Sequence, residues 1–350
     1  MKKLHVLIPL FVLAVSLATV NGFEVTDALG RKVSFENNPK RIVIAGRAHL
    51  MVADAAYLFP EADTRVKAFE KITQGVDNFI PLVDSRYREK RILPVGVGAE
   101  GIAAARPDLV LLKTYMRNKL GRPLEKLRIP VLYLNFESPI EYLREIEMLG
   151  TVMGNVARSR EISAFYRDRL KLIDDGVSKV EKRPTVLFIS YSQKGGAISF
   201  NVPPRAWLQS KLIERAGGQP VWTSAAAQQG WQKTGFEQIA VWDPDYIIVT
   251  SYFSNVDKVT RRLKEDPLWK SLKAVRKGRL LGFPADFFSW DQPDTRWILG
   301  LLWMAKQFHP EAFTTLSVPT QIRLFYREMY TIREDTYRTE IAPLLRGDME

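Results

Sequence analysis

The feature that most constrains the fold is an internal repeat. Residues 100–115 read EGIAAARPDLVLLKTY and residues 237–252 read EQIAVWDPDYIIVTSY, with six identities in sixteen positions and a spacing of 137 residues. Each copy predicts a short helix that starts at a glutamate, a Pro-Asp turn, a buried strand, and a tyrosine at the end of the strand. Pro-Asp suits any such turn, but it does not explain the matched glutamates and tyrosines. The chain is therefore expected to contain two equivalent lobes.

Short apolar runs alternate with helical patterns on both sides of the chain's midpoint, which predicts an α/β lobe with a mainly parallel sheet in each half. In the first half, strands are expected at 41–45, 65–69, 109–112 and 131–134, with helices at 48–58 and 139–149. In the second half, strands are expected at 185–190, 246–250 and 279–283, with a helix at 205–216.

One long helix is predicted between the two halves. Residues 156–180 contain no proline and only Gly176 as a weak point, and they carry apolar residues at helical spacing, namely Ile162, Phe165, Tyr166, Leu170 and Ile173. At about 1.5 Å per residue such a helix is roughly 36 Å long, enough to cross a domain.

The first 22 residues have the pattern of a secretory signal. Lys2 and Lys3 precede an apolar run that ends at Val20, and cleavage is expected after Gly22, with Ala18 as the alternative. An uncleaved N-terminal anchor is the competing interpretation. The expected organisation is a signal peptide, an N-terminal lobe, a linker helix and a C-terminal lobe with terminal helices, at residues 1–22, 23–155, 156–182 and 183–350.

The chain has no cysteine, which excludes a disulfide framework and a lipidated N-terminal cysteine. Together with the signal pattern, this predicts a free periplasmic protein and not a lipoprotein. The formal charge of +12 becomes +10 without Lys2 and Lys3. A basic protein attracts anionic partners, but no nucleic-acid motif is present and export argues against nucleic acid.

No motif for catalysis is present. The sequence contains no G-x-S-x-G elbow, phosphate loop or H-E-x-x-H pair, and it lacks a cysteine nucleophile, so an enzyme is not expected. A bare metal site is also a poor fit, because His49 and His309 are the only histidines that follow the signal segment.

Five segments, taken in order, resemble periplasmic binding proteins for iron siderophores, haem and cobalamin, the helical-backbone metal receptor family. They are FEVTDALGRKVSFENNPKRIVIAG, the two E-x-I-A-x-x-x-P-D units, DPLWKSLKAVRKGRLLGFPAD and SWDQPDTRWILGLLWMAKQFHPE. The resemblance implies two Rossmann-like lobes joined by one rigid helix, with the ligand between them. Open α/β sheets independently place ligands beyond the carboxyl ends of their strands.

The resemblance also implies a partner. In this family a glutamate on the outer surface of each lobe meets arginines of the permease, and Glu100 and Glu237 match those positions. Two equivalent carboxylates suit a two-fold permease with its ATPase. The alternative is that each glutamate only stabilises a helix N-terminus. The protein itself is expected to be a monomer.

Ligand-binding residues are expected where the strands end. Arg47 and His49 follow the first strand and suit an anionic ligand, and the aromatic candidates would cover the flat organic faces of a chelate. Trp231 resembles the ligand-facing tryptophan of cobalamin-binding relatives, whereas the equivalent position in the first lobe is Pro94. For each candidate the alternative is a structural role, such as a local ion pair for Arg47 or core packing for Trp231. The remaining aromatic candidates are Tyr115, Tyr252, Phe253, Phe287 and Trp290, the last two preceding a helix start predicted at Asp291-Gln292-Pro293.

The expected function is therefore that of a substrate-binding protein of an ABC importer, with a ferric siderophore as cargo and no resident cofactor. Haem and cobalamin stay open, since Tyr115, Tyr252 or His49 could serve as an axial ligand of haem. A metal-chelate-handling enzyme and a surface adhesin or sensor are the alternatives from other classes, because a fold does not fix a function.

Overall fold

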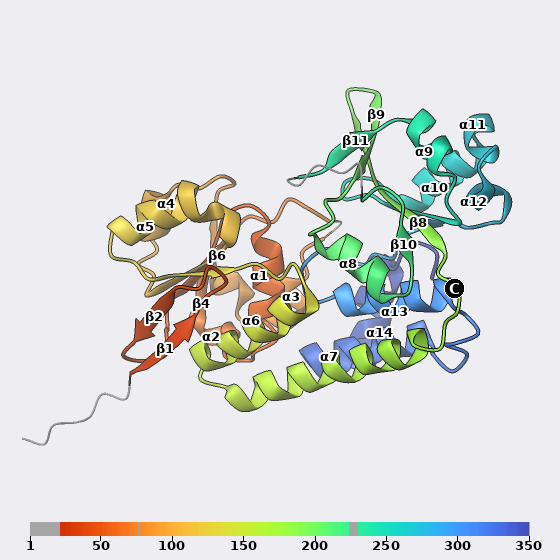
Figure 1. Ribbon diagram of the computed structural model, residues 1–350. Helices are drawn as coiled ribbons and strands as arrows, with labels where there is room; N and C mark the ends of the chain where they lie inside the picture. The colour runs from red at the N-terminus through yellow and green to blue at the C-terminus, as the bar shows by residue number, and fades with distance from the viewer. Residues whose placement is uncertain (1–21, 76, 224–229, 350) are drawn as a thin grey trace, which may run out of the picture.

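The computed structural model describes residues 22–75, 77–223 and 230–349 and shows two α/β lobes connected by one long helix (Figure 1). This is the predicted fold class. Except for Gly22, the predicted signal segment lies outside the described residues.

The N-terminal lobe is built on a five-stranded parallel sheet in the order β5-β4-β3-β6-β7. The central strand β3 is fully buried because its apolar residues are covered on both faces of the sheet. A small antiparallel pair, β1 and β2, precedes this sheet. The strands are β1 Phe23–Thr26, β2 Lys32–Phe35, β3 Ile42–Ile44, β4 Val66–Glu70, β5 Arg91–Leu93, β6 Leu109–Lys113 and β7 Val131–Leu134.

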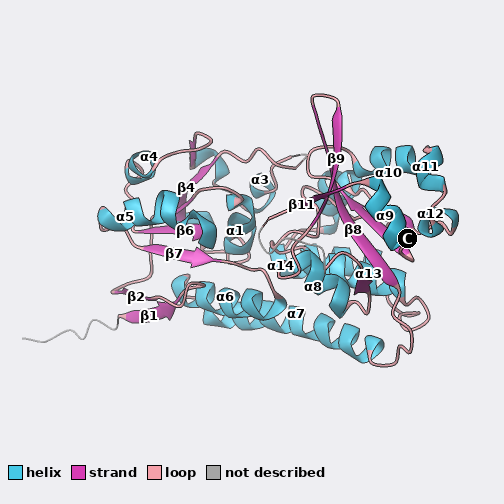
Figure 2. Cartoon of the chain, turned by 45° about the horizontal axis from the view of Figure 1, so that its top comes forward, coloured by secondary structure: helices cyan, strands magenta, loops and turns pink. Residues whose placement is uncertain are grey.

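The C-terminal lobe has a mixed sheet in the order β11-β9-β8-β12-β13, with the short strand β10 also paired to β8. Strand β12 is parallel to both of its neighbours, whereas β9 turns back antiparallel to β8 and forms a hairpin that extends from the lobe (Figure 2). The strands are β8 Thr185–Lys194, β9 Ala197–Val202, β10 Gln219–Pro220, β11 Gln232–Thr234, β12 Tyr246–Thr250 and β13 Leu280–Gly282.

The helices pack around the sheets of the two lobes (Figure 1). In the N-terminal lobe they are α1 His49–Ala56, α2 Ala62–Arg65, α3 Ile80–Val83, α4 Ala99–Ala103, α5 Arg122–Lys126 and α6 Pro139–Val152. The connecting helix is α7 Val156–Val177. In the C-terminal lobe they are α8 Leu208–Arg215, α9 Phe236–Trp242, α10 Val256–Glu265, α11 Pro267–Lys270, α12 Lys273–Arg276, α13 Trp297–Phe308, α14 Val318–Tyr330 and α15 Glu334–Thr336.

The sequence repeat is confirmed as a structural repeat. Helices α4 and α9 both begin after a glycine, Gly98 and Gly235, and each leads through the Pro-Asp turn into a buried strand. These strands, β6 and β12, occupy equivalent places, because each is paired in parallel on both sides. The repeated unit therefore forms the same part of the sheet in both lobes.

Helix α7 runs beneath both lobes (Figure 1), and α6 and α13 pack against it. The side chain of Asn155 caps its first turn by accepting a hydrogen bond from the backbone N–H of Arg158 at 3.0 Å. The predicted apolar positions form its buried face. Gly176, the weak point in the sequence, has a packing role, since a Cβ there would stand 2.4 Å from the ring of Phe313. The helix keeps its last turn against the C-terminal lobe for this reason.

A buried ionic cluster joins the lobes at the centre of the molecule. The Arg296 guanidinium, just before α13, is fully buried and pairs with Asp286 at 2.8 Å and with Asp54 of α1 in the other lobe. Asp294 lies 3.6 Å away, and the guanidinium stands 4.6 Å over the ring of Phe79. The charge of Arg296 in the C-terminal lobe is thus neutralised in part by Asp54 of the N-terminal lobe.

Three carboxylates share this one guanidinium, and burial disfavours the charged forms of Asp54 and Asp294. Burial raises the pKa of Asp54 to about 6, against the opposing effect of Arg296. Burial likewise raises the pKa of Asp294 well above its usual range. The cluster therefore depends on its single cation.

We expect Arg296→Met to lower the free energy of unfolding by about 3–5 kcal/mol, because it leaves buried carboxylates without a counterion. Chemical denaturation at pH 7 measures this. Arg338→Met, which removes an exposed pair with Glu334 at 2.9 Å, is the matched control and should cost about 0.5 kcal/mol or less. Similar losses in the two variants would show that the cluster does not stabilise the lobe junction.

Candidate functional site

The strand ends of both lobes meet at a cavity. Loops that follow the parallel strands β3, β6 and β7 line it from the N-terminal lobe, and the loop that follows β12 lines it from the C-terminal lobe. We call this cavity, of about 650 Å³, the main cleft. The residues on it that carry the argument below are Arg47, Lys113, Tyr115, Asn135, Glu137, Trp207, Gln209, Trp231, Tyr252, Phe253 and Gln292.

The N-terminal lobe supplies the charged wall of the main cleft. Arg47 is exposed in the loop after β3, and Lys113 is buried at the end of β6 with its ammonium donating to the carbonyl of Asn135. Burial lowers the pKa of Lys113, although Glu137 next to it opposes this shift. Burial also raises the pKa of Glu137. Every described charged side chain that lines the main cleft comes from this lobe.

The C-terminal lobe supplies an aromatic wall. The rings of Trp231 and Trp207 meet edge to face with centroids 5.6 Å apart, and Trp231 lies 6.1 Å from Tyr252 in the same manner. The neighbouring Phe253 is 80% exposed. An exposed ring of this size in a cavity offers a face for an organic ligand.

A buried carboxylate fixes part of this wall. Asp291, 1% exposed, accepts hydrogen bonds from the Tyr252 hydroxyl at 2.5 Å and from the Gln209 amide at 3.0 Å. The hydroxyls of Ser289 and Thr250 donate to its other oxygen. The predicted helix start at Asp291 is wrong, because α13 begins at Trp297. Asp291 instead orients two side chains that line the main cleft.

The lobes also touch each other across the main cleft. Glu137 accepts a hydrogen bond from the backbone N–H of Leu208, at the start of α8, at 3.2 Å, and its carbonyl accepts one from Lys211 at 2.8 Å. Gln74 of the N-terminal lobe donates to Gln292 of the other. These contacts set the width of the cavity.

A second cavity of about 560 Å³ opens beside the main cleft, and we call it the N-lobe recess. It shares Arg47, Ala48, Gln74, Tyr115 and Phe253 with the main cleft, and its remaining lining comes from the N-terminal lobe. His49 lies here and not on the main cleft, as the first residue of α1. Its side chain is buried, and burial lowers its pKa.

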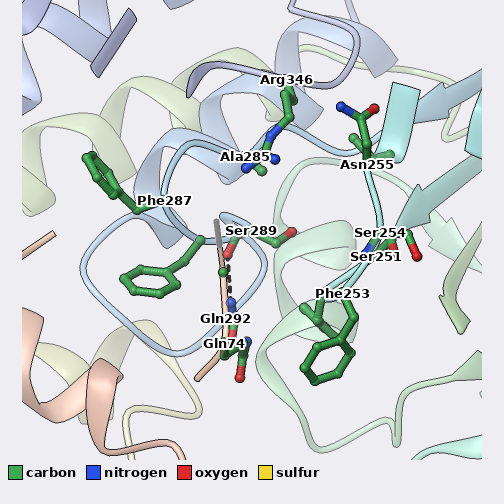
Figure 3. A pocket seen from close by; sticks show the side chains of 14 residues that line it. Gln74, Ser251, Phe253, Ser254, Asn255, Ala285, Phe287, Ser289, Gln292 and Arg346 are labelled. Carbon is green, nitrogen blue, oxygen red and sulfur yellow. Dashed lines mark hydrogen bonds between the residues drawn. The ribbon is translucent and has the colours of Figure 1, made fainter. Parts of the chain in front are cut away.

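Phe287 and Trp290, the last two aromatic candidates, do not line the main cleft. Trp290 is fully buried, and its indole N–H donates to Asp286 at 2.9 Å, so it belongs to the core beside the ionic cluster. It lines neither the main cleft, nor the N-lobe recess, nor the smaller pocket beside Phe287. Phe287 borders a smaller pocket of about 190 Å³, but it is 3% exposed and packs on Phe79. Figure 3 shows its ring directed away from Phe253 and Gln292. Asp286 attracts the tryptophan inward, which the sequence pattern does not reveal.

The predicted docking glutamates have equivalent positions. Glu100 and Glu237 are each the second residue of their helix, are both exposed, and take part in none of the ion pairs found among the described residues. The structure places them away from the cleft residues, since neither lines any of the cavities above.

Sequence reasoning missed several residues of the site. Lys113, Trp207 and Gln209 line the main cleft, yet Lys113 reads as a strand end and the other two as the start of a surface helix. The repeat could have identified Lys113, because Thr250 has the equivalent position in the second copy. Thr250 donates to Asp291 beneath the cleft.

Comparison with known proteins identifies the family. A family model described as periplasmic binding protein matches residues 51–287, more than half of the chain. The chain belongs to this family. The resemblance predicted from the sequence is thereby confirmed. None of the described helices is long and apolar enough to cross a membrane.

Individual relatives are distant, and they cover between 47% and 94% of the chain. The molybdate-binding protein MolA of Haemophilus influenzae is 20% identical over 94% of this chain and 97% of its own length. The Fe(3+)-citrate-binding protein YfmC of Bacillus subtilis is 22% identical over 74% of this chain and 77% of its own. The vitamin B12-binding protein of Yersinia pestis is 23% identical over 47% of this chain and 56% of its own.

Solved structures of similar fold include a periplasmic solute binding protein from Veillonella parvula, with a TM-score of 0.70 and 19% identity over 92% of this chain and 97% of that one. MolA bound to molybdate has a TM-score of 0.71 and 17% identity over 89% of this chain and 98% of that one. At such identities these matches show the shared fold alone.

We expect NMR titration to show that His49 stays neutral below its usual pKa of 6.5. As the pH falls, the unfolded chain therefore takes up a proton at His49 before the folded protein does. The contribution of His49 to the free energy of unfolding is present above pH 6.5 and is lost as the pH falls through the lower pKa of the folded protein. The free energy of unfolding of His49→Gln should therefore fall less than that of the wild type between pH 7 and pH 5. The resonance that disappears in this variant assigns the signal. A folded midpoint at or above 6.5 would contradict the burial argument.

Proposed function

We propose that this periplasmic binding protein is the substrate-binding component of an ABC importer and that it carries a chelated metal, with a ferric siderophore as the favoured cargo. It acts outside the cytoplasmic membrane as a monomer, released by cleavage of the predicted signal segment, and hands its cargo to the permease and its ATPase. Its relatives include proteins named for molybdate, ferric citrate and vitamin B12, which supports transport of a metal-centred ligand.

The asymmetry of the main cleft carries this proposal. One wall presents Arg47 and Lys113 beside Glu137, whose pKa is raised by burial, and the opposite wall presents Trp231, Tyr252 and Phe253. An anionic chelate has the matching two properties, because its metal-bound oxygens carry charge and its ligand backbone is organic and partly flat. A cavity of about 650 Å³ lies in the size range of small-molecule sites.

Haem is the second candidate, and its axial ligand would come from Tyr115, Tyr252 or His49. The Tyr252 hydroxyl donates to Asp291, the Tyr115 hydroxyl donates to the carbonyl of Arg47 at 3.0 Å, and His49 lies in the N-lobe recess and not in the main cleft. Vitamin B12 needs no such ligand and is the stronger alternative, given the named relatives.

Titration of the purified protein tests the cargo. We expect tryptophan fluorescence to be quenched saturably by one member of a panel of catecholate, hydroxamate and carboxylate ferric chelates, haem and vitamin B12. Trp231 and Trp207 should report binding, whereas the buried Trp290 should not. Trp231→Ala should weaken binding about tenfold or more, since an aromatic anchor at the centre of a site dominates affinity.

Trp242→Ala, a tryptophan of α9 that lines none of the cavities above, is the matched control and should bind as the wild type does. No response to any panel member would reject a chelated metal as cargo. A response that both variants lose equally would point to a general loss of folding.

The proposed route of delivery uses the two exposed glutamates. Their equivalent positions in α4 and α9 give a pseudo-symmetric pair of carboxylates, which suits a two-fold permease surface carrying arginines. Neither carboxylate is engaged in an ion pair between described residues, so both are available to a partner.

Glu100→Ala combined with Glu237→Ala should reduce uptake in cells about tenfold while leaving the dissociation constant of the cargo unchanged, because the charges contact the permease and not the ligand. Each single variant should have a smaller effect. Glu311→Ala, another exposed carboxylate, serves as the control. Wild-type uptake by the double variant would exclude these residues as the docking pair.

A further inference from the structure

The N-lobe recess has properties that the proposed function leaves unused. It is nearly as large as the main cleft and is continuous with it, because Arg47, Tyr115 and Phe253 line both. A ligand in the main cleft therefore has direct access to the recess. The residues that line the recess indicate which chemical group it would accept.

Its lining carries a net positive charge. Lys71 follows β4 and Lys119 follows β6, both are exposed, and together with Arg47 they surround the recess. None of the three takes part in the ion pairs found among the described residues. The one carboxylate of the lining, Glu70, offsets one of these three charges. It accepts hydrogen bonds from the backbone N–H groups of Gly46 at 2.8 Å and Gly96 at 2.7 Å, and it lies near His49.

The recess also contains an unpaired acceptor. His49 is 6% exposed, and its Nδ1 lies 2.9 Å from the carbonyl oxygen of Gly46. A carbonyl only accepts, so Nδ1 carries the proton and Nε2 has a free lone pair. No described group bonds to this Nε2. A buried acceptor without a partner is unfavourable, and a donor group on a ligand would satisfy it.

We propose that the N-lobe recess is a second subsite, which takes an oxyanionic arm of the cargo that also carries an O–H or N–H donor. A carboxylate beside a hydroxyl is the simplest such arm. The cations around the recess bind the oxyanion, and His49 accepts the hydrogen bond from the neighbouring donor. In this form the inference rests on the proposed function, because it treats the arm as part of a chelate in the main cleft.

The experiment compares matched variants of the mature protein by calorimetric titration. Lys71→Met/Lys119→Met removes two cations of the recess, and Lys126→Met/Lys277→Met removes two exposed cations that line none of the cavities above. The probes are ferric citrate, a ferric trihydroxamate without carboxylates, iron-free citrate, and molybdate. His49→Phe tests the acceptor at similar volume, with its thermal midpoint measured to check folding.

We expect the recess pair to weaken ferric citrate about tenfold or more and the trihydroxamate less than about twofold, with no effect of the control pair. His49→Phe should weaken only ligands that carry a hydroxyl beside the carboxylate. Wild-type affinity of the recess variants for every bound probe would overturn the inference. If Trp231→Ala alone weakened the chelates, the proposed cargo would stand without the subsite.

Failure of the proposed cargo can be distinguished from failure of the subsite. Recess-dependent binding of iron-free citrate or molybdate, without binding of any chelate, would keep the subsite and reject the chelated cargo. Binding of none of the probes by the wild type would reject both.

Discussion

The guanidinium of Arg296 is the interaction on which the arrangement of the two lobes depends. It comes from the C-terminal lobe, is fully buried, and is neutralised by Asp54 of the other lobe as well as by Asp286 beside it. Removing a charge from water is unfavourable by several kcal/mol, so this position is stable only while both lobes supply their carboxylates. Helix α7 connects the same two lobes, and none of its residues lines the main cleft.

This junction connects to the site through a short stretch of chain. Asp286, Asp291 and Arg296 lie within one loop between β13 and α13. Arg296 pairs with Asp54 of the other lobe, Asp286 pairs with the same guanidinium, and Asp291 orients Tyr252 and Gln209 in the main cleft. One loop therefore sets both the relation of the lobes and the shape of the aromatic wall.

The sequence predicted the fold well because its signals are local and strong. Buried strands appear as short apolar runs, and the repeat identified β6 and β12 as equivalent strands with their following tyrosines. Arg47, Tyr115, Tyr252 and Phe253 were predicted near strand ends and line the main cleft for the same reason, since residues after parallel strands lie at one edge of the sheet. The direction of a loop side chain has no such signal. Trp290 turned inward because Asp286 accepts its indole N–H.

The same limit explains the residues that belong to the second cavity. His49 and Arg47 are separated by one residue, yet only Arg47 lines the main cleft, because α1 begins at His49 and carries that side chain into the N-lobe recess. Lys113 was missed because a lysine at a strand end is usually exposed, and its burial depends on Asn135 in another loop. Such pairings between distant loops are not encoded in periodicity.

Two adjacent rings of the aromatic wall differ in their freedom, and this affects which ligands the protein can hold. Tyr252 is anchored through its hydroxyl, so it loses little conformational entropy when a ligand covers it. Phe253 is 80% exposed, and ordering a mobile side chain costs about 0.5–1.5 kcal/mol. The anchored ring fixes the plane on which a ligand lies, and the free ring adjusts to its thickness. A wall built this way tolerates a series of related molecules, which would differ more in residence time than in whether they bind.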